Sequence, residues 1–219
     1  MAKRFTKNMN DKIIVSGICG SLREGSYTRM ALNIALLGAK DAGAKINLID
    51  LRKYDLPLMD GRRDEKTFPE DVFKLRDEVQ KSDGIILGTP EYHGGYSGVL
   101  KNALDLMGFD EFQGKMIGLL GVAGGSMGAT NSLNGLHTIG RTLRAWVVPF
   151  QVSIASALKE FDNEGNLKNR MLEQRVKQLG EKVTRFAYLH KIGKSEEFLE
   201  AWQGAPVNPG GERRSKEGD

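Results

Sequence analysis

The chain has 219 residues, of which 40% are hydrophobic and 27% are charged, and its formal net charge is +4. This length supports one well-buried domain. The mild basic excess comes without the basic helix, aromatic–basic interleaving or zinc spacing that would indicate a nucleic-acid partner. No apolar run approaches the length of a membrane span, and the charged N-terminus lacks the apolar region of a signal peptide. We therefore expect a cytoplasmic protein without membrane insertion.

The first predicted elements are a strand and a helix, preceded by a lead over residues 1–11 that we expect to be flexible. The β-branched run from Ile13 to Val15 predicts a strand buried on both faces. Small residues follow, and a helix begins near Ser26. Its apolar face is expected to hold Met30, Ala31, Ile34, Ala35 and Leu37.

The loop between this strand and this helix has the composition of an anion site. The arrangement directs free backbone N–H groups and the positive end of a helix toward one point. Hydroxyls at Ser21, Ser26 and Thr28, with the charge of Arg23, suit a phosphate monoester. The loop has neither the Gly-Lys pair of a P-loop nor the glycine spacing of a dinucleotide fingerprint. An ordinary turn in which Ser26 only caps the helix is the open alternative.

The rest of the chain alternates strands with helices. Apolar runs predict strands over 45–51, 84–89, 115–122 and 145–154. Between them we expect a helix with Pro69 in its first turn and Phe68, Val72, Leu75 and Val79 on its apolar face, a helix over 97–107, and one that ends near 143. A last helix carries Leu172, Val176, Leu179, Val183 and Phe186 on one face.

This alternation predicts an α/β fold, a doubly wound five-stranded parallel sheet with helices on both faces. We expect one domain over residues 12–203, followed by a disordered tail over 204–219 that is rich in glycine, proline and charge. The single cysteine, Cys19, excludes an internal disulfide framework, and we expect it to be a small buried side chain. The three histidines show no metal-ligand spacing, so no metal site is predicted.

In such a sheet, ligands bind outside the carboxyl ends of the strands. The loops that leave the first, third and fourth strands are GSLREGSYT, PEYHGG and AGGSMG. Their glycines allow a planar ligand to approach the backbone closely. A glycine in any one loop is explained by a turn, but three such loops at one edge predict a shared ligand.

Three segments of the chain resemble the motifs of the NADPH-dependent FMN reductase family, which has a flavodoxin-like fold and includes azo, quinone and chromate reductases. They are GSLREGSYTR at 20–29, TPEYHGGYSGVLKNALD at 89–105 and GGSMGA at 124–129. The middle segment is the most specific. The resemblance covers nearly all of residues 12–190 in the right order, and it implies a flavodoxin-like FMN-binding domain.

The resemblance also implies which residues bind FMN. The phosphate group would be held in the loop that contains Ser21, Arg23, Ser26, Tyr27 and Thr28, although the family often has Asn at the position of Thr28. The edge of the ring would be lined, mostly through backbone atoms, by Pro90, Glu91, Tyr92, His93 and Gly94. Another part of the ring would be covered by Gly124, Gly125 and Ser126.

The implied activity is transfer of a hydride from NADPH through bound FMN to a small-molecule acceptor, such as free flavin, a quinone or an azo compound. Most of the chemistry belongs to the cofactor. His93 is a candidate proton donor to the reduced acceptor, and Tyr92 and Tyr96 are candidates for packing on flavin or substrate. The extra ribose phosphate of NADPH has candidate partners in Arg23, Arg62 and Arg63.

Members of the family form homodimers or homotetramers through the helix after Gly95, and Lys101 and Asp105 match positions in that helix. An exposed ion pair explains these two residues equally well. The alternative function is a non-enzymatic flavodoxin-like electron carrier or an FMN-binding sensor. Carriers that dock on basic partners tend to be acidic, whereas this chain is mildly basic. A dedicated quinone or azo reductase shares all the residues above and stays open.

Overall fold

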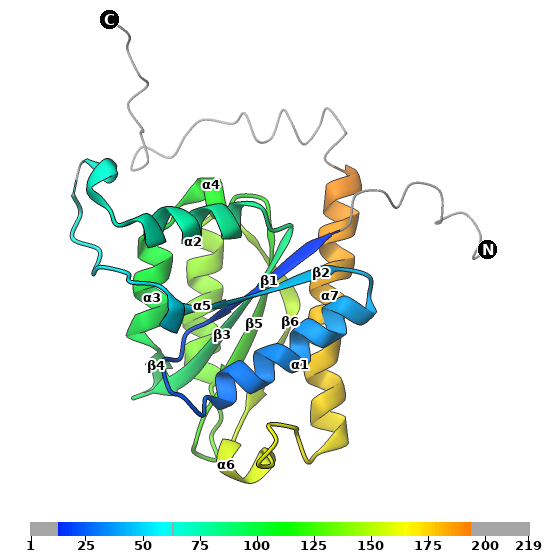
Figure 1. The fold of residues 1–219 in the computed structure, drawn as a ribbon. Coiled ribbons are helices and arrows are strands. Elements are labelled where there is room, and N and C mark those ends of the chain that lie inside the picture. Colours follow the sequence, from blue (N-terminus) through cyan, green and yellow to red (C-terminus); the bar gives the residue numbers. More distant parts are fainter. Residues whose placement is uncertain (1–12, 63, 194–219) are drawn as a thin grey trace, which may run out of the picture.

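The computed structural model describes residues 13–62 and 64–193 (Figure 1). The expected lead, Arg63 and the expected tail lie outside the described residues. The strands are β1 (Ile14–Cys19), β2 (Lys45–Asp50), β3 (Gly84–Tyr92), β4 (Gly95–Tyr96), β5 (Met116–Val122) and β6 (Trp146–Ile154). The helices are α1 (Tyr27–Asp41), α2 (Glu70–Gln80), α3 (Gly98–Asp105), α4 (Phe109–Phe112), α5 (Thr130–Thr142), α6 (Ala157–Glu160) and α7 (Arg170–Gly193), with 3₁₀ turns at Leu51–Lys53 and Glu65–Thr67.

The predicted parallel sheet is confirmed. Its strand order is β2-β1-β3-β5-β6, and every neighbouring pair along this path is parallel. The two-residue strand β4 adds an antiparallel pair with the end of β3, so the sheet has six strands rather than five. The order reverses between β1 and β3, which in a doubly wound sheet is the place where ligands bind.

Helices cover both faces of the sheet (Figure 1). The apolar core on one face is built from α1 and α7, and the core on the other face from α2, α3 and α5. Two positions on the predicted apolar faces are exposed instead, because Leu37 is 46% exposed and Phe186 is 37% exposed. The buried stripes continue through Leu36 and Ala187, their immediate neighbours in the chain. Within the described ranges, no helix combines the length and the apolar character that a membrane span requires.

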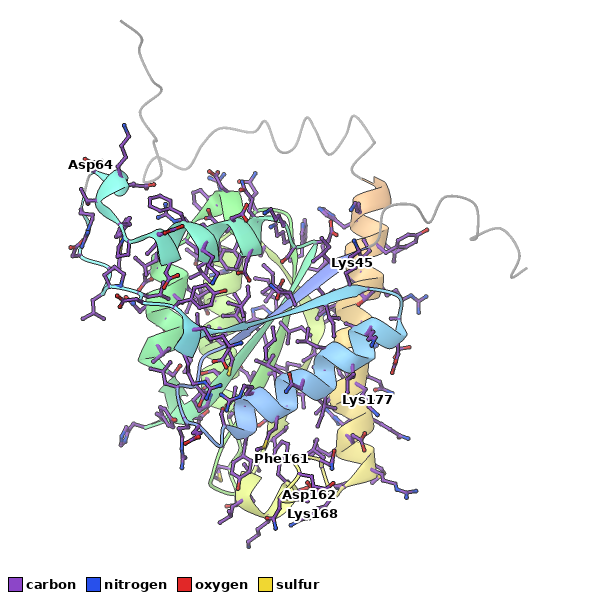
Figure 2. The ribbon with its side chains drawn as sticks, in the orientation of Figure 1. Lys45, Asp64, Phe161, Asp162, Lys168 and Lys177 are labelled. Atoms are coloured by element: carbon purple, nitrogen blue, oxygen red, sulfur yellow. The ribbon has the colours of Figure 1, made fainter. Side chains whose placement is uncertain are left out.

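The two helices on the first face cross closely at a pair of glycines. A Cβ atom at Gly180 would overlap the carbonyl oxygen of Ala35, and one at Gly38 would overlap the carbonyl oxygen of Lys177. Figure 2 shows Lys177 on α7, where that helix runs beside α1. Both obstacles are backbone atoms, so a larger residue would force the helices apart. This crossing fixes α1, and with it the loop that precedes α1.

We expect Gly180→Ala to destabilise the protein by about 2–4 kcal/mol, because the added methyl group cannot be accommodated without a backbone shift. Urea unfolding monitored by circular dichroism measures the change. The matched control is Gly98→Ala at the start of α3, where a Cβ atom would meet no other atom within 4 Å. Its effect should stay within about 1 kcal/mol. Equal effects of the two substitutions would contradict the close crossing.

Candidate functional site

The structure brings the three predicted loops to one edge of the sheet, at the lower end of the molecule in Figure 1. The first two loops meet at Gly20, whose N–H donates to the Gly88 carbonyl (2.8 Å) and whose carbonyl accepts from the Ser97 hydroxyl (2.6 Å). The Ser97 N–H in turn donates to the Thr89 hydroxyl at 3.0 Å. A Cβ atom at Gly20 would lie only 2.7 Å from Cβ of Leu100, so this junction requires glycine.

The loop before α1 contains the helix cap that was one of the two interpretations of its sequence. The Ser26 hydroxyl caps α1 by accepting the N–H of Arg29 at 3.2 Å, as the simpler interpretation predicts. A hydroxyl that accepts one hydrogen bond can also donate one of its own. Among the described residues, no acceptor takes the backbone N–H groups of residues 22–26. Ser21 and Thr28 are buried beside this loop, whereas Arg23 is exposed.

Arg29 organises this loop, and sequence analysis missed it. Its guanidinium group donates to the carbonyl oxygen of Arg23 at 3.3 Å and to that of Glu24. In a trans peptide the C=O and the N–H point in opposite directions. Carbonyl groups that face Arg29 therefore direct the following N–H groups away from it, toward the open side. The residue type gave no signal, because only the fold shows that the side chain turns back along α1.

Asp50 supports Arg29 from the end of β2. Its carboxylate is buried, lies 3.8 Å from Arg29 and accepts from Nε and Nη2 of Arg52 at 2.5–3.1 Å. These hydrogen bonds from Arg52, together with the charge of Arg29, lower the pKa of Asp50 below its ordinary value. The loop is thus held by a buried carboxylate through an arginine.

The segment predicted as a polar loop at Pro90–Gly95 is instead a β-hairpin. Glu91 pairs with Tyr96 and Tyr92 with Gly95. The connecting turn is His93–Gly94, with φ values of 51° and 77°. Two residues with positive φ form the turn type that matches the twist of a hairpin. The prediction of a loop was wrong here because a two-residue strand is too short to produce alternation in the sequence.

The hairpin packs on the first turns of α5. The Glu91 carboxylate accepts the backbone N–H of Ser132 at 3.1 Å. The ring of Tyr96 lies against Gly135, where a Cβ atom would be 2.6 Å from Cε1 of the ring. Tyr96 is therefore engaged with α5, whereas Tyr92 is 45% exposed and His93 is also exposed.

The third loop presents an open glycine surface. A Cβ atom at Gly124 or Gly125 would meet no atom within 4 Å, and Ser126 is exposed beside them. The loop is nevertheless anchored, since the Gly125 carbonyl accepts from the Ser156 N–H at 2.9 Å and the Ser153 hydroxyl accepts from the Ala129 N–H at 2.8 Å. A fixed backbone that faces empty space suits a flat ligand.

Tyr27 and Cys19 contribute to packing around the loop before α1. The Tyr27 ring stacks on Phe161 with centroids 5.1 Å apart, and Figure 2 shows Phe161 below the first turn of α1. Cys19 is fully buried, as expected, and burial raises the pKa of its thiol.

The more distant candidates have partners of their own. Arg62 binds the Asp60 carboxylate at 2.7 Å and donates to the Thr67 carbonyl, and the pairing lowers the pKa of Asp60 to about 2. Lys101 and Asp105 form a partly exposed i,i+4 ion pair at 2.6 Å, which accounts for both residues. In the described part of the chain, no three His, Cys, Asp or Glu side chains gather as metal ligands.

Comparison with known proteins agrees with this geometry. The model of the NADPH-dependent FMN reductase family matches residues 13–159. An NAD(P)H-dependent FMN reductase of Pseudomonas aeruginosa is 33% identical over 177 residues, which cover 78% of this chain and 91% of that protein. An NADPH azoreductase of Bacillus sp. (strain OY1-2) is 43% identical over 105 residues, which cover 48% of this chain and 58% of the relative.

Among solved structures, the fold is similar to FerB, a flavoenzyme NAD(P)H:(acceptor) oxidoreductase from Paracoccus denitrificans. The TM-score is 0.65 at 21% identity, and the match covers 82% of this chain and 99% of FerB. A flavodoxin from the domain Archaea matches with a TM-score of 0.54 at 14% identity, over 81% of this chain and 99% of the flavodoxin. These similarities confirm the flavodoxin-like fold.

We expect Asp50→Asn to lower the free energy of unfolding at pH 7 by about 1.5–3 kcal/mol, the range for a hydrogen bond to a charged group. Since folding lowers the pKa of Asp50, its contribution is present above the unfolded value of about 3.9 and is lost as the pH falls through the folded value. The difference between wild type and variant should therefore shrink on acidification, as measured by urea unfolding from pH 7 to pH 3.

The control for this prediction is Asp60→Asn, which removes a carboxylate from a similar Asp-x-Arg pair on the surface. Solvent screens that pair, so we expect no measurable change in stability. A pH-independent cost for Asp50→Asn would contradict the ion-pair account.

Proposed function

The chain belongs to the NADPH-dependent FMN reductase family, and on that premise we propose that it binds FMN at the edge formed by the three loops and reduces a small-molecule acceptor with NADPH. One observation carries the proposal: a loop with free N–H groups, a hairpin and an anchored glycine loop face the same edge of the sheet. When bound, FMN supplies the hydride chemistry, accepting two electrons from the nicotinamide and passing them to the acceptor.

The phosphate group of FMN is held by the loop before α1. Backbone N–H groups of residues 22–26 donate to it, together with the hydroxyls of Ser21, Ser26 and Thr28 and the guanidinium group of Arg23. Arg29 is outside this contact set and keeps the N–H groups in position through the Arg23 and Glu24 carbonyls.

The hairpin and the third loop would hold the ring. Backbone atoms of Pro90, Glu91, Tyr92, His93 and Gly94 would line one edge, and Gly124, Gly125 and Ser126 would cover another part. The glycines suit this role because no atom lies where their side chains would be. Rigid backbone donors need no rearrangement during the reaction, which favours charge development on the ring.

Two exposed side chains of the hairpin are available to the substrates. Tyr92 can pack on nicotinamide or acceptor, and His93 at the turn can donate a proton to the reduced acceptor. Of the arginines considered for the extra ribose phosphate of NADPH, Arg62 already binds Asp60, and Arg23 is assigned to the phosphate group of FMN.

The acceptor class we propose is free flavin, a quinone or an azo compound. The relatives named FMN reductase and azoreductase support this range. We further propose that the protein is a cytoplasmic homo-oligomer that associates through the surface of α3. An electron carrier is disfavoured because carriers that dock on basic partners tend to be acidic, whereas this chain is mildly basic.

NADPH oxidation with a panel of acceptors tests this function. The purified protein should be yellow and oxidise NADPH faster than NADH, with FMN, a quinone or an azo dye as acceptor. A metal oxyanion completes the panel. Bound FMN without turnover with either nicotinamide would support the carrier instead.

A second prediction concerns Arg23. We expect Arg23→Ala to weaken FMN binding by about 10- to 100-fold, because it removes a charge-assisted hydrogen bond worth about 1.5–3 kcal/mol. Riboflavin, which has no phosphate group, should bind variant and wild type equally in fluorescence titrations. Leu22→Ala, a change at an exposed neighbour, is the control and should leave both affinities unchanged. An unchanged FMN dissociation constant in Arg23→Ala would remove Arg23 from the site.

A further inference from the structure

Helix α5 lacks a cap in its own sequence. Its N-cap residue is Ala129, which has no side-chain acceptor, and there is no acidic residue in its first turn. The acceptor that caps this helix comes from another part of the chain. The Glu91 carboxylate accepts the N–H of Ser132 in the first turn at 3.1 Å. Glu91 stands in β3, two residues before the His93–Gly94 turn. A carboxylate here satisfies an unpaired donor and faces the positive end of the helix.

From this contact we propose that Glu91 is a positioning residue, and that its charge sets how strongly the site prefers oxidised over reduced flavin. The inference rests on the proposed function, because it needs FMN beside the hairpin. Its geometric part is independent of any ligand. The residue acts through the backbone it holds and through its charge, without contact between its carboxylate and the substrate.

The mechanical part follows from two contacts along the hairpin. Glu91 binds the backbone of Ser132, and the Tyr96 ring covers Gly135. The second of these is a van der Waals contact, which permits sliding. The hydrogen bond of Glu91 is directional and therefore fixes the hairpin along α5.

The electrostatic part follows from the charge that reduction adds. A hydride brings two electrons and one proton, so the ring gains one negative charge. The N-terminus of α5 would attract that charge with the equivalent of about half a positive charge. The full negative charge of Glu91 more than cancels it. The site then avoids excessive stabilisation of reduced flavin, which keeps transfer to the acceptor favourable.

Two variants of Glu91 separate these parts. Glu91→Gln keeps an oxygen that can accept the Ser132 N–H but removes the charge. We expect its FMN dissociation constant to stay within about twofold of wild type, and its preference for reduced over oxidised FMN to rise about tenfold, which is about 30 mV for a two-electron couple. Glu91→Ala removes both, so FMN should also bind about 5- to 10-fold more weakly, as expected for a lost helix cap.

Ser132→Ala is the matched control. It keeps the backbone N–H that Glu91 binds and removes only a buried hydroxyl that has no hydrogen-bond partner among the described residues. We expect its FMN affinity and reduction potential to equal those of wild type. Potentials are measured by equilibration with a reference dye, and affinities by fluorescence titration of the full chain.

Hydrogen exchange of the Ser132 amide in the FMN-free protein tests the contact itself. Protection should fall in Glu91→Ala and persist in Glu91→Gln. Unchanged protection in Glu91→Ala would overturn the contact, and a wild-type potential in Glu91→Gln would overturn the electrostatic role. Failure of the proposed function looks different, because wild-type protein would then bind no FMN while the exchange result could still hold.

Discussion

The site depends on one close backbone contact, at Gly20. This residue directly follows β1, donates to Gly88 in the neighbouring strand and accepts from Ser97 at the start of α3. No side chain fits there, since Leu100 and the Gly88 carbonyl already occupy the space. The contact joins the loop of β1 to the hairpin of β3 across the point where strand order reverses. The loop after β1 and the hairpin therefore have a fixed spacing, which a ligand that touches both requires.

Most of the fold could be predicted because its signals are local. The five parallel strands produce apolar runs, and the helices between them produce stripes with a helical period. The predicted burial was wrong at positions where tertiary contacts determine which side of a helix is buried. Leu37 and Phe186 fit their apolar stripes in the sequence, yet the close crossing at Gly38 and Gly180 sets which side of each helix is buried. Nothing in the sequence shows that each of these glycines will face the backbone of the other helix.

The loops of the site were predictable, whereas the interactions that hold them were not. The glycine and hydroxyl content of the loops was the signal in the sequence. These residue types suit a phosphate and a flat ring without help from distant parts of the chain. Arg29, Asp50 and Glu91 act through pairings with distant segments, and a single sequence carries no information about such pairings. The hairpin was predicted as a loop because its turn lacks the residues that usually mark a hairpin. Its turn places His93 in a left-handed conformation that few residues other than glycine adopt, so its sequence gives no hairpin signal.

Backbone groups and side chains therefore have different roles in the proposed site. The parts proposed to grip the cofactor are backbone N–H groups and glycines, and buried residues away from the ligand keep them in place. Three large exposed side chains, Leu22, Tyr92 and Met127, lie on the same loops and hairpin. Changes at these positions can alter which acceptor fits while the grip on the cofactor stays intact. This separation gives a physical reason why one scaffold can serve proteins named as FMN reductases and as azoreductases.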